Sequence, residues 1–127
     1  MTRQSIFAAA ALVAALTPAA WAGDLYTASM QAVPGTMLRC TITNVSTTEV
    51  GVTATLKDDT NATINTSGNC YGNPAVLNPG ESCAVDSNIP DWKTGHCHFT
   101  ASSTKIRAAL VVIGNTGVVT SALPATK

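Results

Sequence analysis

The chain has 127 residues, of which 46% are hydrophobic, 5% aromatic and 11% charged, and seven basic residues balance seven acidic ones. This length fits one domain, and the charges form no basic stripe of the kind that nucleic acids or anionic membrane surfaces require of a partner. With so few aromatic residues, the core must be built from aliphatic side chains. Exported domains with such thin cores are commonly cross-linked by disulfides.

The first 22 residues have the order of a secretory signal. Arg3 precedes an apolar run from Ile6 to Leu16, and Ala20-Trp21-Ala22 supplies the small residues found before a cleavage point. The run is too short for a membrane-spanning helix, which needs about 20 residues. We therefore expect cleavage after residue 22, no stable membrane insertion afterwards, and an exported protein in the periplasm or outside the cell.

The remainder predicts short strands separated by turns, with no helical period. We expect seven strands, which in chain order cover residues 24–33, 36–45, 49–57, 82–86, 95–101, 104–113 and 118–123. An eighth, short strand is expected at 62–66. Several of them alternate apolar with polar residues, which is the period of a sheet with one buried face. The residues expected to face the core are Leu38, Cys40, Ile42, Val50, Val52, Ala54, Leu56, Cys97, Phe99, Ile106, Ala108, Leu110 and Val112. The pattern predicts an all-β, antiparallel β-sandwich that forms a single domain over residues 23–127.

Four cysteines allow three disulfide pairings. Cys40 and Cys97 each lie in the middle of an alternating strand, on its apolar face, which suits a bridge across the core. Cys70 and Cys83 are close in sequence, on either side of a Pro-Gly turn, and suit a local cross-link. We favour these two bonds. The alternatives are a zinc site, which normally uses closely spaced cysteine pairs, and a redox site, which normally uses C-x-x-C; the chain has neither pattern.

His96 and His98 are the candidate metal ligands. Alternate residues of a strand share a face about 6.6 Å apart, so the two imidazoles could hold copper or zinc together. Cys97 would then face the opposite side, and a third ligand would have to be a carboxylate or backbone oxygen. We expect instead that both imidazoles face solvent, and we keep metal binding as the alternative function.

Other chemical motifs have weaker support. Asp58–Asn61 has oxygens that could bind calcium, but it lacks the ligand spacing of a known loop and predicts a plain turn. A Ser-His-Asp triad could be drawn from Ser102 or Ser103, His96 or His98, and Asp91, but no G-x-S-x-G motif accompanies it. We therefore expect no catalytic residues and no cofactor, and a protein that is not an enzyme.

Trp92 and Tyr71 are the two aromatic residues predicted to lie in loops, at 87–94 and 67–73. Loop aromatics can stack on sugar rings or anchor a protein partner. For Trp92 we expect instead that the ring covers one end of the core, because Pro90-Asp91-Trp92 leads directly into a strand.

A set of short motifs marks a resemblance to a known group. The motifs are Leu38-x-Cys40-x-Ile42-x-Asn44-Val45, Leu77-x-Pro79-Gly80-Glu81, Cys97-x-Phe99 and Ile106-Arg107-Ala108-Ala109-Leu110. Their order resembles small exported bacterial proteins of unknown function with an immunoglobulin-like β-sandwich. The resemblance implies that fold for the seven to eight strands counted above, and a bond from the second-strand cysteine to the late-strand cysteine. It brings no activity or site residues. The chain departs from the antibody-type pattern because no tryptophan lies at 49–57.

These observations predict an exported, non-enzymatic module that binds an unknown protein, glycan or envelope component. They do not fix its oligomeric state. A third hypothesis is a fimbrial-type subunit that adds a strand from a neighbour, although Val118–Leu123 is expected to complete the fold within the same chain.

Overall fold

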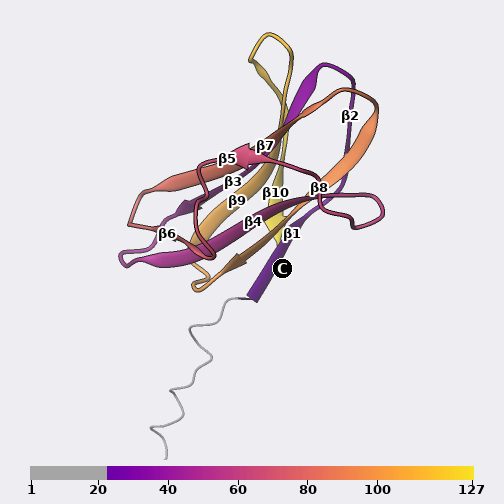
Figure 1. Ribbon diagram of the computed structural model, residues 1–127. Helices are drawn as coiled ribbons and strands as arrows, with labels where there is room; N and C mark the ends of the chain where they lie inside the picture. Colours follow the sequence, from indigo (N-terminus) through magenta and orange to yellow (C-terminus); the bar gives the residue numbers. More distant parts are fainter. Residues whose placement is uncertain (1–22) are drawn as a thin grey trace, which may run out of the picture.

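Figure 1 shows a computed structural model of the protein, which describes residues 23–127. The predicted signal sequence, residues 1–22, lies outside the described residues. The described chain folds into strands and turns without a helix, which confirms the all-β prediction. Over the same residues, no helix is long and apolar enough to span a membrane.

The strands of the described chain form one antiparallel sheet. In chain order they are β1 (Gly23–Thr27), β2 (Met30–Ala32), β3 (Thr36–Asn44), β4 (Val50–Asp58), β5 (Ser67–Gly68), β6 (Ala75–Leu77), β7 (Ser82–Ile89), β8 (Lys93–Ala101), β9 (Ile106–Ile113) and β10 (Val119–Thr126). They hydrogen-bond in the order β5-β7-β3-β9-β10-β1-β8-β4-β6, and β2 lies beside β8. This sheet curls into a half-barrel (Figure 1).

β1 is the strand that makes the sheet continuous. Tyr26 and Thr27 pair with the end of β10, and residues 23–26 pair with the end of β8. The two layers expected of a sandwich are therefore two halves of one curled sheet, joined through β1. One half holds β5, β7, β3, β9 and β10, the other holds β1, β8, β4, β6 and β2, and the core lies between them.

The core follows the alternation of the sequence. In β3, β4, β8 and β9 every second side chain points inward, and most of these side chains are fully buried. Of the residues predicted to face the core, only Ala54, Ile106 and Ala108 are partly exposed, and all three pack against the core. Burial of aliphatic surface, at about 25 cal/mol per Å², is the main stabilising contribution to such a fold.

The structure differs from the sequence prediction in its short elements. The strand expected at 24–33 is divided into β1 and β2, and β5 and β6 were not predicted as strands, so the sheet has ten strands rather than seven or eight. Strands of two or three residues are too short to show an alternating pattern in the sequence. They are defined only by the hydrogen bonds that their backbone makes with a neighbouring strand. The strand expected at 62–66 is reduced to a single bridge between Thr63 and Lys57.

The last strand also runs further than predicted, because β10 continues through Pro124 to Thr126. Proline cannot donate a hydrogen bond to a neighbouring strand and is confined to strand edges. Pro124 meets this condition because it has a strand partner on one side only. It pairs with Ala109 of β9, and the pairing of β10 with β1 includes Ala125 and Thr126 but not Pro124.

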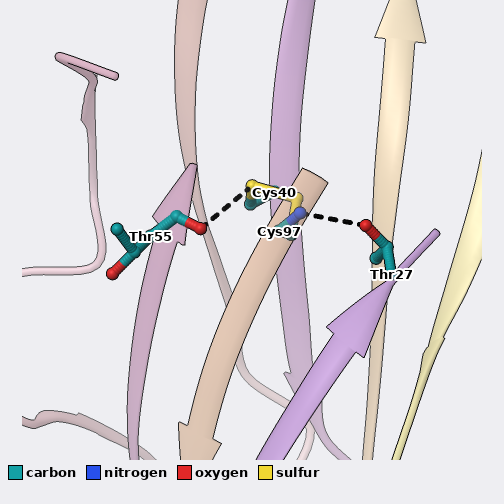
Figure 2. Close-up of a disulfide and its surroundings, with 4 residues drawn as sticks. All are labelled: Thr27, Cys40, Thr55 and Cys97. Atoms are coloured by element: carbon teal, nitrogen blue, oxygen red, sulfur yellow. Dashed lines mark hydrogen bonds between the residues drawn. A yellow bond between two sulfur atoms is a disulfide. The ribbon is translucent and has the colours of Figure 1, made fainter. Parts of the chain in front are cut away.

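Two disulfides cross-link the sheet, and they are the two that the sequence favours. Cys40 of β3 is bonded to Cys97 of β8 across the core, with both side chains fully buried and the Cα atoms 5.7 Å apart (Figure 2). Cys70 is bonded to Cys83 and ties the loop after β5 to β7. No cysteine of the described chain is free. Structural disulfides of this kind are typical of proteins in oxidising compartments.

Figure 2 also shows the polar contacts around the central disulfide. The backbone N–H of Cys97 donates a hydrogen bond to Thr27 Oγ1 over 2.9 Å. The Sγ atom of Cys40 lies 3.9 Å from the carbonyl oxygen of Thr55; because a disulfide sulfur carries no proton, this is a van der Waals contact. Thr27 stands at the break between β1 and β2, and its hydroxyl takes the place of the missing strand neighbour of Cys97.

Candidate functional site

The outward side of β8 carries an unbroken row of polar side chains. Thr94, His96, His98 and Thr100 alternate with residues that face the core, so all four point to the outer side of the sheet. On one side of this row, Gln31 lies opposite Thr94, and Tyr26 and Asp24 lie opposite His98 and Thr100. On the other side, Lys57, Thr55 and Thr53 of β4 lie opposite His96, His98 and Thr100.

We call this surface the outer polar face, and it consists of Asp24, Tyr26, Gln31, Thr53, Thr55, Lys57, Thr94, His96, His98 and Thr100. The face offers hydroxyl, amide, imidazole, ammonium and carboxylate groups around one aromatic ring. The hydroxyls of Thr53 and Thr100 are hydrogen-bonded to each other across the strands. Such a surface is suited to hydrogen bonding with a ligand that has many hydroxyl groups.

Tyr26 and His98 form the centre of the outer polar face. Their rings stack with centroids 4.5 Å apart and planes inclined by 10°. His98 Nε2 lies 2.8 Å from Asp24 Oδ1, and this hydrogen bond holds the edge of the imidazole. Tyr26 remains 46% exposed, so the phenol ring is held in place by its neighbours and is still open to solvent.

Trp92 stands at the end of the same surface, immediately before β8. Its side chain is 62% exposed, so the prediction that it covers the end of the core is wrong. The buried side chains near this turn are instead those of Ala32, which lies opposite Lys93, and Ile89. Trp92 instead lines an open pocket of about 280 Å³ together with Gln31, Asp58, Asp59, Lys93 and Thr94.

Asp58 is held rigidly beside this pocket. Its Oδ1 atom accepts hydrogen bonds from the Thr60 hydroxyl over 2.7 Å and from the backbone N–H groups of Thr60 and Ala62 over 2.9 Å each. These bonds, led by the one from the Thr60 side chain, lower the pKa of Asp58 below its ordinary value of 3.8. The predicted turn at 58–61 is thus organised by its first carboxylate.

Tyr71, the other predicted contact aromatic, lies in a different part of the molecule. It is 78% exposed in the loop after β5, in the half of the sheet that does not contain β8. The hollow beside it is lined by Arg39 and Asp86, which form an ion pair with each other over 3.2 Å. The structure therefore does not bring Tyr71 and Trp92 into one site.

The structure separates the groups of the triad drawn from the sequence. Asp91 precedes β8, whereas Ser102 and Ser103 follow its end, and nine residues of strand span roughly 30 Å. The hydroxyl of Ser102 accepts a hydrogen bond from Gly51 N, and that of Ser103 accepts one from Lys105 N. At the far end of β8, Ser102 thus bonds to the neighbouring strand β4, and Ser103 bonds within its own turn.

The histidines do share the outer face, as their spacing predicts. Within residues 23–127 they join no group of three or more His, Cys, Asp or Glu side chains that could hold a metal ion. The neighbour of His96 across the strands is Lys57, whose charge opposes a bound cation.

Sequence reasoning missed the contributions of Asp24, Tyr26 and Gln31. The alternation of the first strand places Asp24 and Tyr26 on one face, but it does not reveal which strand lies beside them. Only the pairing of β1 and β2 with β8 places these side chains next to the histidines. Comparisons of the chain with models of protein families, with curated proteins and with solved structures gave no match.

Proposed function

We propose that this protein is an exported, non-enzymatic module that binds a glycan or protein of the cell envelope or its surroundings through the outer polar face and the Trp92 pocket. The observation that carries the proposal is the position of Trp92, a large aromatic side chain left mostly exposed in an open pocket that borders a polar sheet face. Exposed tryptophans are strongly enriched among the residues that supply binding energy at interfaces.

The covalent framework supports the same proposal. Two disulfides hold the sheet, and the Tyr26 ring is fixed by His98, so the surface is organised before a partner arrives. A preorganised surface loses little entropy on binding. We further propose that the two halves of the curled sheet correspond to the layers of an immunoglobulin-like sandwich, in accord with the resemblance to small exported bacterial proteins.

The proposal is tested by capture from envelope extracts with the disulfide-bonded protein of residues 23–127. We expect Trp92→Ala to lose the captured partner, while Tyr71→Ala, which removes an even more exposed aromatic from the other half of the sheet, retains it. Equal retention by the two variants would contradict the assignment of the site to Trp92.

Metal binding through His96 and His98 is the second candidate, and one observation favours it: both imidazoles lie on the outward side of β8, two residues apart on the same strand. Its test is thermal unfolding with excess copper or zinc. A melting temperature that rises in the wild type and not in His98→Gln would support the candidate, and an unchanged melting temperature in the wild type would remove it.

A further inference from the structure

The ligand class of this surface can be inferred from its chemistry. We propose that the outer polar face and the Trp92 pocket together bind a linear, uncharged chain of β-linked pyranose sugars, with Trp92 and Tyr26 as two separate stacking positions. This inference rests on the proposed function, since it specifies the ligand of the same site.

The two aromatic rings are the first argument. A pyranose with equatorial hydroxyls has a flat face of C–H groups, which packs on the electron-rich face of an aromatic ring. Tyr26 lies opposite His98, and Trp92 precedes His98 by six residues, so the backbone positions that carry the two rings are roughly 20 Å apart at about 3.3 Å per residue. This separation requires a chain of several sugar rings rather than a single one.

The groups between the rings are the second argument. Gln31, Thr94 and His96 lie along β2 and β8 between Trp92 and Tyr26, and each offers a hydrogen-bonding group on the outer side. Sugar hydroxyls both donate and accept, so they can pair with amide, hydroxyl and imidazole groups alike. A protein partner would instead favour a central apolar cluster, and the three positions between the rings, Gln31, Thr94 and His96, are all polar.

The charges are the third argument. Near the proposed path, Lys57 and Lys93 are offset by Asp24, Asp58 and Asp59, and the carboxylate of Asp24 is already bonded to His98. A surface with mixed, nearly balanced charge is complementary neither to a polyanion, which would need a basic stripe, nor to a strongly basic peptide. An uncharged polymer fits this balance.

The test is isothermal titration of the protein of residues 23–127 with β-1,4-linked oligomers of glucose and of N-acetylglucosamine. We expect the hexasaccharide of one series to bind at least about tenfold more tightly than its disaccharide, because only the longer chain reaches both rings. Trp92→Ala and Tyr26→Ala are each expected to weaken binding of the hexasaccharide by about tenfold or more. Tyr26→Phe, which keeps the ring, and Tyr71→Ala are expected to bind as the wild type does.

Melting temperatures of all variants show whether each one is folded, and only folded variants are compared. Absence of binding to both series at millimolar concentration would overturn the inference. If Trp92→Ala still abolishes capture of an envelope protein in that case, the proposed function stands and its ligand is a protein. If Trp92→Ala affects neither assay, both proposals fail.

Discussion

Cys40 and Cys97 are bonded across the core although three strands separate β3 from β8 along the sheet. The bond therefore fixes the curl of the sheet: it holds the middle of one half against the middle of the other. The outer polar face lies on the opposite side of β8 from this bond, so the cross-link supports the strand that carries the candidate site.

Removal of the two disulfides should have unequal effects. Replacing Cys40 and Cys97 with Ala opens a loop of 57 residues and should lower the free energy of unfolding by about 4 kcal/mol. Replacing Cys70 and Cys83 with Ala opens a loop of 13 residues and should lower it by about 3 kcal/mol. Urea unfolding of the two double variants measures both values. A larger cost for the Cys70–Cys83 variant would contradict this ranking.

Thr27→Val should reveal the value of a single buried hydroxyl. Valine has nearly the shape of threonine but leaves the Cys97 N–H without its acceptor in the core, which should cost about 1–3 kcal/mol. Thr27→Ser, which keeps the hydroxyl, is the matched control and should lose less. Chemical denaturation compares the three proteins, and equal stability of Thr27→Val and the wild type would show that the hydrogen bond contributes nothing.

Asn44 should be among the most sensitive polar positions. The side chain is fully buried, donates to the carbonyl oxygens of Thr48 and Leu77, and accepts from the backbone N–H and hydroxyl of Ser46. Asn44→Ala leaves these partners unpaired and should destabilise the protein by about 3 kcal/mol. Asn69→Ala is the control: it removes one exposed hydrogen bond, which Asn69 Oδ1 accepts from the backbone N–H of Ala84, and it should lower the free energy of unfolding by about 1 kcal/mol. Thermal unfolding that ranks the two variants in the reverse order would contradict the role of burial.

Asp58 should give a pH-dependent contribution to stability. Because the folded state lowers its pKa below 3.8, the carboxylate stabilises the fold above the ordinary pKa, and this contribution is lost as the pH falls through the lowered value. Asp58→Asn should therefore be less stable than the wild type at pH 6, and the difference should shrink below about pH 4. Melting temperatures measured across this range test the sign, and a constant difference would show that ionisation of Asp58 plays no part.

Most of the fold was accessible from the sequence because the long strands repeat a simple pattern. Alternating apolar residues in β3, β4, β8 and β9 predicted both the strands and the sides that they bury, and the position of Cys40 and Cys97 on those sides favoured the observed bond. Each of these features depends on the period of a strand, which is local.

Other features depend on which strands become neighbours, and only the tertiary structure decides that. The pairing of β1 with both β10 and β8 turns two expected layers into one sheet, and it brings Asp24 and Tyr26 beside His98. The exposure of Trp92 is likewise a property of the folded chain that the strand pattern does not reveal. Periodicity is a property of one segment, whereas strand pairing and core packing depend on contacts between segments that are distant in the chain. The sequence by itself therefore determined the long strands and their buried sides. The tertiary structure decided which side chains form the surface on which binding is proposed.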